Sequence, residues 1–270
     1  MKVHHYTNLE TLALILHNRN IRFNRLDKVD DIEEGNIISD GVNPGKYTFV
    51  SCWTEAEEEN ISLWKMYSGN GIGVRISLEQ DMFKDYLITD GSKIGNYEVK
   101  GIINSKVPVQ EFEQKEYFVL PMFDLDSGLF YKNIEYVEDV NDVTRNIVQR
   151  EALDNEHFNV KIYWGEIGKY KHKRWAFQEE SRYTIFIAPQ NPFWIKDKKK
   201  VGPEMISTLY NGVELSIDSY YLELKQEVLD EMTITLNPTI KDAQKILVES
   251  LCAKYAPKAT IRESNLKIRY

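Results

Sequence analysis

The chain has 270 residues, 42% hydrophobic and 28% charged, which is typical of a globular protein and far from a disordered one. Its 34 basic and 42 acidic side chains give a net charge of −8, which argues against a general nucleic-acid coat. Two cysteines 200 residues apart, without a CxxC pair, support neither a disulfide framework nor a cysteine zinc site. Because the N-terminus is polar and no apolar stretch approaches ~20 residues, we expect a cytoplasmic protein without a membrane anchor.

The first eighty residues carry clear secondary-structure signals. Residues 3–6 predict a short strand, and Thr7-Asn-Leu-Glu10 predicts a capping box at the start of a helix that ends near residue 18. The helix signal is an apolar stripe with spacing i, i+3, i+4, i+7, made by Leu9, Leu12, Ala13 and Leu16. A second short apolar stretch follows at 21–23. β-Branched and aromatic residues then predict strands over 46–53 and 72–78, and a short helix is expected between them over 61–67.

Residues 81–158 give weaker signals. Strands are predicted over 97–103 and 107–109, and a helix is predicted near 138–157. No stretch rich in Pro, Gly or Ser divides the chain. We therefore expect one domain over residues 1–270, with a helical or irregular insertion at 81–158.

The last third again shows regular patterns. A strand is predicted over 183–188, stopped by Pro189, followed by a basic loop at 198–200 and a strand over 220–224. A helix is expected near the C-terminus with one apolar face, and then a final strand at 260–262 and 266–268; the face consists of Ala243, Ile246, Leu247, Ser250 and Leu251. Strands and helices in this order predict an α+β fold.

Common enzyme signatures are absent from the sequence. There is no HExxH, Walker loop, GxGxxG or GxSxG motif. Five histidines are too scattered for a metal site, and the adjacent His4 and His5 would point to opposite sides of a strand. We therefore predict no metal site of these kinds.

Three short groups stand out by their order along the chain. His5-Tyr-Thr7 precedes the first helix, Ser62-Leu-Trp-Lys-Met-Tyr67 lies between two predicted strands, and Trp175-Ala-Phe-Gln178-Glu-Glu180-Ser-Arg182 leads into a third. These groups resemble the H-Y-T, S-x-x-x-W-x-x-Y and W-x-x-E-x-E-x-R motifs of a bacterial domain-of-unknown-function family. That family is similar to the His–Tyr–Glu branch of the ADP-ribosyltransferase superfamily, which includes poly(ADP-ribose) polymerases and DarT toxins.

The resemblance implies a fold and a set of site residues. The fold would be a split, mixed β-sheet flanked by helices, with the dinucleotide NAD bound as co-substrate between the sheet halves and no metal. Glu180 would be the catalytic residue, since breaking the nicotinamide–ribose bond creates an oxocarbenium-like centre that a fixed anion stabilises. The NAD-binding residues would be His5, Tyr6, Thr7, Tyr67 and Gln178, with the ring of Tyr67 against nicotinamide and His5 on the adenosine-side ribose.

The resemblance also implies partners. Such bacterial enzymes act as toxins or as antiviral, phage-defence effectors on a macromolecular acceptor; protein, RNA and DNA all remain open, and an antitoxin is a compatible partner. The chain departs from the family pattern at two places. First, Gln178 stands where the family has a glutamate that accompanies arginine modification, which argues against arginine as the acceptor. Second, residues 30–33 read Asp-Asp-Ile-Glu where the family has N-D-P-x-E.

The residues themselves leave other interpretations open. Glu180 and Arg182 would share one face of a strand, where an ion pair would keep the carboxylate ionised. Trp64 and Trp175 are expected as core anchors beneath the site. The basic residues 171–174 are expected as a solvated turn, with contact to a pyrophosphate or an acidic partner as the alternative. Two other functions are a catalytically silent nucleotide- or protein-binding module, and a metal-dependent hydrolase or nuclease; the second would use Asp30, Asp31, Glu33 and His5.

Overall fold

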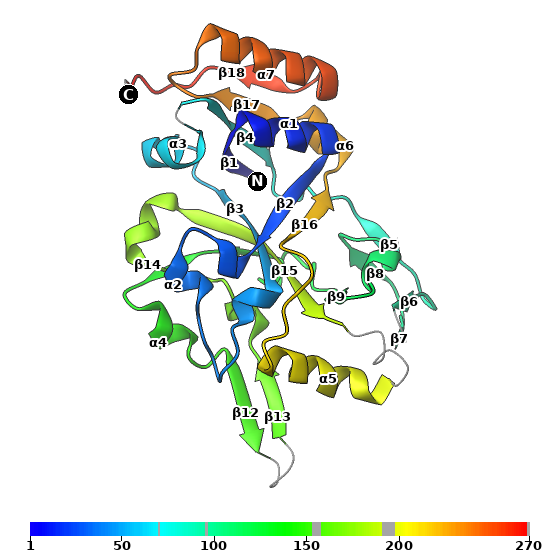
Figure 1. The fold of residues 1–270 in the computed structure, drawn as a ribbon. Helices are drawn as coiled ribbons and strands as arrows, with labels where there is room; N and C mark the ends of the chain where they lie inside the picture. The colour runs from blue at the N-terminus through cyan, green and yellow to red at the C-terminus, as the bar shows by residue number, and fades with distance from the viewer. Residues whose placement is uncertain (70, 95–96, 153–157, 191–197, 269–270) are drawn as a thin grey trace.

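A ten-stranded mixed sheet forms the centre of the computed structural model, which describes residues 1–69, 71–94, 97–152, 158–190 and 198–268 (Figure 1). Seven strands lie in the order β10-β15-β3-β1-β4-β17-β18, while β2, β16 and β9 join from the side. Their bounds are β1 (Lys2–Asn8), β2 (Asn20–Arg25), β3 (Thr48–Thr54), β4 (Gly73–Glu79), β9 (Tyr117–Val119), β10 (Tyr131–Asn133), β15 (Glu180–Pro189), β16 (Ser219–Glu223), β17 (Thr233–Leu236) and β18 (Thr260–Arg262). The expected α+β class is confirmed.

The sheet divides along one edge of β3. One side of β3 pairs with β15 over seven residues, from Thr48 to Thr54. The other side pairs with β2 at Phe49 and Val50 and with β1 only where Thr54 meets His4. In the described part of the chain, residues 51–53 of β3 pair with neither β1 nor β2 on this side. β1 then continues beside β4 for its whole length, so the two halves of the sheet diverge from this single contact (Figure 1).

Helices and short 3-10 turns surround the sheet. α1 follows β1 and packs on α7, the long helix at the end of the chain drawn in orange-red, while α2 contacts β14 (Figure 1). The helices are α1 (Leu9–Asn18), α2 (Ile32–Gly35), α3 (Ile61–Tyr67), α4 (Val140–Thr144), α5 (Lys198–Tyr210), α6 (Gln226–Asp230) and α7 (Asp242–Tyr255). The 3-10 turns are η1 (Leu26–Lys28), η2 (Pro44–Tyr47), η3 (Val109–Glu111), η4 (Trp164–Glu166) and η5 (Lys173–Gln178). No helix in the described part of the chain is long and apolar enough to cross a bilayer.

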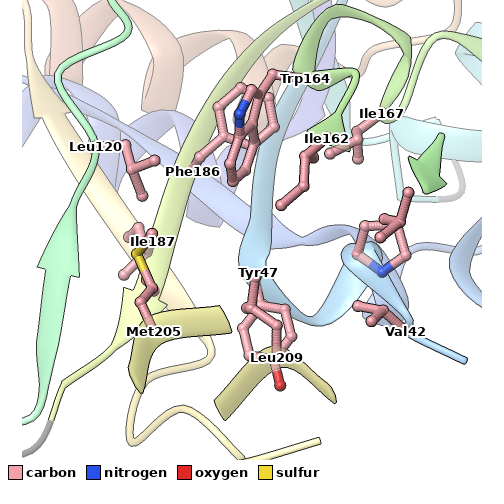
Figure 2. Close-up of a pocket in the computed structure, with 13 residues that line it drawn as sticks. Val42, Tyr47, Leu120, Ile162, Trp164, Ile167, Phe186, Ile187, Met205 and Leu209 are labelled. Atoms are coloured by element: carbon pink, nitrogen blue, oxygen red, sulfur yellow. The ribbon is translucent and has the colours of Figure 1, made fainter. Parts of the chain in front are cut away.

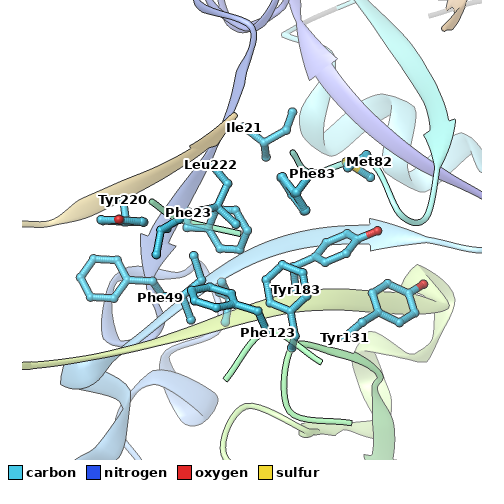
Figure 3. Close-up of a cluster of buried hydrophobic side chains, with 14 of the residues drawn as sticks. Ile21, Phe23, Phe49, Met82, Phe83, Phe123, Tyr131, Tyr183, Tyr220 and Leu222 are labelled. Carbon is cyan, nitrogen blue, oxygen red and sulfur yellow. The ribbon is translucent and has the colours of Figure 1, made fainter. Parts of the chain in front are cut away.

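Aromatic side chains from distant segments form the densest part of the core. Phe83 is 1% exposed, and its ring centroid lies 4.9 Å from that of Tyr183 and 5.6 Å from that of Phe23 (Figure 3). Phe130 and Tyr131 join them beside β15, with edge-on or tilted ring contacts that aromatic pairs prefer. One aromatic core therefore joins four distant parts of the chain, at residues 21–23, 83, 130–131 and 183.

The regular structure of the segment 81–158 is mainly short strands joined by turns, and the helix predicted near 138–157 is wrong for most of its length. Only α4 lies there, and residues 148–152 form β12 of a hairpin, with residues 153–157 outside the described residues. β9 and β10 pair with β15, which places parts of the segment in the central sheet. Four two-stranded sheets complete the fold: β5 (Tyr86–Ile88) with β8 (Ile103–Ser105), β6 (Lys93–Ile94) with β7 (Tyr97–Glu98), β11 (Glu135–Val137) with β14 (Tyr170–His172), and β12 (Val148–Ala152) with β13 (Phe158–Ile162).

Several local predictions need correction. Asn8, not Thr7, caps α1: its side chain accepts from the Thr11 N–H, because Thr7 still belongs to β1. The predicted basic loop 198–200 begins helix α5, and residues 107–109 and 266–268 form no strand.

The C-terminal helix is confirmed, but its buried face is different from the one expected. α7 buries Val248 and Cys252, whereas Ile246 and Leu247 are 59% and 56% exposed. The spacing of apolar residues identified a helix correctly, but not the side of it that packs on α1.

Candidate functional site

The end of α3 and the start of β15 bring the predicted residues of the second and third motifs together. Asn60 caps α3, since its side-chain oxygen accepts from the N–H groups of Ser62 and Leu63. Its amide nitrogen donates to the carbonyl of Phe177 at 2.6 Å, which ties α3 to η5. Tyr67 is the last residue of the helix and lies beside Gln178.

The turn before β15 fixes where Glu180 points. Glu179 adopts a left-handed conformation with φ of 43°, which is rare for a residue with a side chain. Its carbonyl accepts from the hydroxyl of Thr54 at 2.8 Å. The N–H of Glu180 donates to the hydroxyl of Tyr136 at 2.8 Å. β15 then begins at Glu180, so Glu180 and Arg182 share a face of the sheet, as the sequence predicted.

Glu180 belongs to a buried network of four charged side chains. Its Oε1 accepts from Nε of Arg182 at 2.9 Å, and its Oε2 accepts from Nζ of Lys171 at 2.7 Å. Arg182 also donates to both carboxylate oxygens of Glu34, and Nζ of Lys171 lies 3.8 Å from Oε2 of Glu34. All four residues are at most 5% exposed. Two carboxylates and two cations therefore neutralise each other inside the protein.

The network moves the carboxylate pKa values in opposite directions. Burial alone would raise the pKa of Glu180, but Arg182 and Lys171 overcome this and lower it to about 2. At Glu34, which faces Arg182 from the end of α2, burial outweighs the attraction of the cations and raises the pKa. The predicted ion pair of Glu180 with Arg182 is confirmed, and Glu180 is ionised at neutral pH.

Tyr67 and Gln178 continue the network toward the surface. Lys171 donates to the side-chain oxygen of Gln178 at 2.9 Å, and the Gln178 amide donates to the hydroxyl of Tyr67 at 2.9 Å. The same hydroxyl donates to Asp30 at 2.9 Å. Burial, with Asp30 next, raises the pKa of Tyr67. The Tyr67 side chain is 36% exposed, so one side of it faces solvent.

His5 lies on the other half of the divided sheet. Its Nδ1 lies 2.9 Å from the carbonyl oxygen of Cys52, and its ring is 5.1 Å from that of Trp53. The ring thus fills the place where β1 and β3 do not pair. Burial lowers the pKa of His5, which favours the neutral ring. Cys52 is the cross-strand partner of Arg182, and its thiol pKa is raised by burial and then by Glu180. Cys52 therefore separates His5 from Glu180.

Tyr6 and Thr7 are placed differently from the other predicted residues. Tyr6 is 5% exposed and packs edge-on against Trp64 at 4.9 Å in a small cluster with Leu63. Its hydroxyl accepts from the N–H of Asn60 at 2.9 Å. Thr7 is also buried, within β1. Trp64 is fully buried as predicted, whereas Trp175 is only partly buried, under the ammonium of Lys171.

Sequence reasoning missed three contributors to the network. Lys171, predicted to lie in a solvated turn, is 3% exposed because it lies in β14 and points at Glu180. Glu34 and Tyr136 carried no signal of their own. Alternation along β14 could have separated Lys171 from the more exposed His172, but nothing in the acidic run 30–34 distinguishes Glu34 from Glu33.

Of two cavities in the described part of the chain, one adjoins these residues. The other is an apolar void of about 20 Å³, bounded by Tyr47, Trp164, Phe186 and Met205 (Figure 2). It has room for about one water molecule, so it is too small for a larger ligand. The adjoining cavity has a volume of about 580 Å³ and lies between Thr54, residues 56–63 and residues 178–179.

The acidic residues suggested for metal-dependent chemistry do not converge. Asp31 caps α2, Asp30 accepts from Tyr67, and His5 contacts Cys52. Within the described residues, no three His, Cys, Asp or Glu side chains are placed to hold a metal ion. Comparisons with protein-family models, curated proteins and solved structures found no significant match.

Proposed function

We propose that the protein is an NAD-dependent ADP-ribosyltransferase. The observation that carries the proposal is the meeting of Tyr67, Gln178 and Glu180 next to the point where β1 and β3 diverge, with His5 on the facing strand. The motifs contributing these residues occur in the same order along the chain as in the family that they resemble. The diverging strands support a dinucleotide lying between the two halves of the sheet.

In this proposal Glu180 stabilises the reacting sugar. The bond between C1′ of the ribose and the nicotinamide nitrogen breaks, and nicotinamide leaves with the bonding electron pair. The acceptor's nucleophile then forms a bond to C1′ and loses a proton. A carboxylate whose pKa is held at about 2 is ionised throughout, which suits it to the positive charge that develops on the sugar.

The neighbouring side chains would position the dinucleotide. The exposed side of Tyr67 offers an aromatic surface to nicotinamide, and the hydrogen bonds to Asp30 and Gln178 keep its ring in place. His5 is neutral and held at Cys52, from where it would contact a ribose hydroxyl. A ribose hydroxyl that bonds to Oε2 of Glu180 must replace the donor that Lys171 now supplies.

A second function has a specific observation in its favour. Both carboxylate oxygens of Glu180 already accept from cations, and the residue is only 5% exposed. A purely structural ion network would look the same. This favours a catalytically silent module that binds a nucleotide or a protein through the residues around Tyr67.

Nicotinamide release from NAD distinguishes these functions. Wild-type protein is compared with Glu180→Gln and with Tyr67→Ala, with and without cell lysate as a source of acceptor. Glu249→Gln, an exposed change on α7, is the matched control for loss of one carboxylate. We expect release by wild type and the control, and a loss of at least about 100-fold in Glu180→Gln.

Folding is checked on every variant by thermal unfolding, because Glu180→Gln also removes a charge from the buried network. Tyr67→Ala changes a partly exposed residue and removes none of the four buried charges, so its loss of release does not depend on the fold of Glu180→Gln. Folded wild type that releases no nicotinamide under either condition supports the silent module. Release that persists in folded Glu180→Gln shows that another residue is catalytic.

A further inference from the structure

We propose that residues 264–266, here called the strap, form a releasable contact that sets the position of α3 and of the loop 56–60 before it. This loop and the first turn of α3 line the cavity of about 580 Å³, together with Thr54 and residues 178–179. Release of the strap would therefore change the opening of the cavity and the position of Tyr67, the last residue of α3.

α3 belongs to the connection between the two halves of the divided sheet. The chain leaves β3 at Thr54 and enters the other half at Gly73, where β4 begins beside β1. Toward β15, the side chain of Asn60 donates to the carbonyl of Phe177 in η5. Toward β1, the N–H of Asn60 donates to the hydroxyl of Tyr6 at 2.9 Å. Contacts with both halves thus determine where α3 lies.

The strap adds a further contact, made to a single carboxylate. The hydroxyl of Ser264 donates to Oε2 of Glu59 at 2.6 Å, and the N–H of Asn265 donates to Oε1 at 2.9 Å. Oε2 also accepts from the indole nitrogen of Trp64 at 3.1 Å. Because Glu59 immediately precedes the cap of α3, its carboxylate joins the strap directly to the start of the helix.

Leu266 completes this contact on the apolar side. It packs against Tyr6, Leu63 and Trp64, which form a small cluster separate from the main hydrophobic core. The N–H of Leu266 donates to the hydroxyl of Ser264 at 3.0 Å, which keeps the strap in a tight turn. Both buried residues of α3 belong to this cluster, so the strap takes part directly in the apolar packing of the helix.

The strap is buried much less than the sheet beside it. Ser264 and Leu266 are only partly buried, and Asn265 and Lys267 are exposed. In contrast, β15 is buried along its whole length. Segments with few buried apolar contacts open at a smaller cost in free energy than core strands do. Opening of the strap together with α3 therefore need not unfold the sheet.

Such an opening would act on the candidate site through two hydrogen bonds. Movement of α3 away from η5 breaks the bond from Asn60 to Phe177 and the bond from Gln178 to Tyr67. The cavity wall then moves relative to residues 178–179, and Tyr67 loses a partner that fixes its ring. These movements are the same in a catalytic site and in a silent one, so the strap acts independently of the proposed transferase function.

Hydrogen exchange followed by mass spectrometry tests the strap. The variants are Ser264→Ala, which removes the hydroxyl bonded to Glu59, and Leu266→Ala, which removes most of an apolar side chain. Lys267→Ala is the matched control, because it shortens an exposed neighbour. We expect both strap variants to speed exchange in peptides covering 56–67 about tenfold, while peptides from β15 and the control exchange as in wild type.

Unchanged exchange over 56–67 in both folded strap variants overturns the proposal; folding is checked by thermal unfolding. Equal acceleration over 56–67 and in β15 also overturns it, since the segment would then stabilise the whole fold. The link to the site is measured by NMR of isotope-labelled tyrosine, with Tyr67→Phe to assign the signal. We expect the ring signal of Tyr67 to shift in Leu266→Ala and not in Lys267→Ala, and a signal unchanged in both strap variants refutes the link.

Discussion

Replacing Arg182 tests how the buried network contributes to stability. In Arg182→Met, the carboxylates of Glu34 and Glu180 lose their shared cation and only Lys171 is left to compensate them. Breaking a buried ion pair from one side costs about 3–5 kcal/mol, because a charge remains without its partner in a low-dielectric environment. Methionine keeps much of the side-chain volume, so most of this loss is electrostatic.

The size of the effect can be converted into a melting temperature. At about 2.1 cal/mol/K per residue, unfolding this chain of 270 residues has an entropy of about 570 cal/mol/K. A loss of about 3–5 kcal/mol then lowers Tm by about 5–9 °C. The assay is urea unfolding together with calorimetry, on wild type, Arg182→Met, Glu34→Gln and the double variant.

Glu34→Gln is the matched control, because it removes a charge while keeping the shape. Burial already raises the pKa of Glu34, so we expect Glu34→Gln to cost less than half as much as Arg182→Met. In the double variant the number of uncompensated carboxylates falls, and the loss should be smaller than the sum of the two single losses. A loss below about 1 kcal/mol in Arg182→Met, or additive losses, would refute the reasoning.

Three further predictions concern other parts of the fold. The pKa of His4 is about 6.5 in the unfolded chain and is lowered to about 4 in the folded protein, so His4 contributes up to about 3 kcal/mol of stability above pH 6.5, and this is lost as pH falls to about 4. In urea unfolding, His4→Gln should therefore make the free energy of unfolding depend less on pH between about 4 and about 6.5. An unchanged pH dependence would contradict this. Gly73→Ala places a Cβ 2.4 Å from the carbonyl oxygen of Thr7, so we expect about 1–3 kcal/mol of destabilisation in urea unfolding. The control is Gly165→Ala, where an added Cβ meets only Leu129 at 3.9 Å; equal losses in the two variants would argue against the contact. Phe83→Ala should cost about 3–5 kcal/mol in the same assay, whereas the exposed Leu87→Ala should cost little; a similar loss for both would mean that Phe83 is not part of the core.

The sequence predicted elements well where periodicity was strong. The helix 61–67 and the strand 72–78 were predicted to within one residue of their observed bounds, and the strand 183–188 lies inside the longer β15, since the local residue patterns agreed there. The segment 81–158 was harder because its strands are two to five residues long, which is too short for a period to be visible. On α7, the apolar spacing found the helix, but the packing against α1 that selects Val248 and Cys252 is a tertiary effect.

In the candidate site too, contacts between residues close in the chain could be predicted, whereas contacts between distant residues could not. Glu180 and Arg182 could be paired from the sequence because alternation along a strand puts them on one face. Lys171 could not be placed, because a lysine in a basic run is normally solvated and only burial against Glu180 and Gln178 makes it different. Glu34 reaches the network from 148 residues away in the chain, which no local pattern encodes.

The position of Lys171 determines what the buried network can do. Lys171 and Arg182 together keep Glu180 ionised, which a transferase needs, but they also occupy both of its oxygens, which a structural network needs. The two contacts are not equivalent. Arg182 is fully buried and bonded to two carboxylates, whereas Lys171 also contacts Gln178, which lines the open cavity and bonds to the half-exposed Tyr67. The Lys171 contact is therefore the one that a ligand entering beside Tyr67 can displace, so Oε2 of Glu180 is the atom through which this network would act on a substrate.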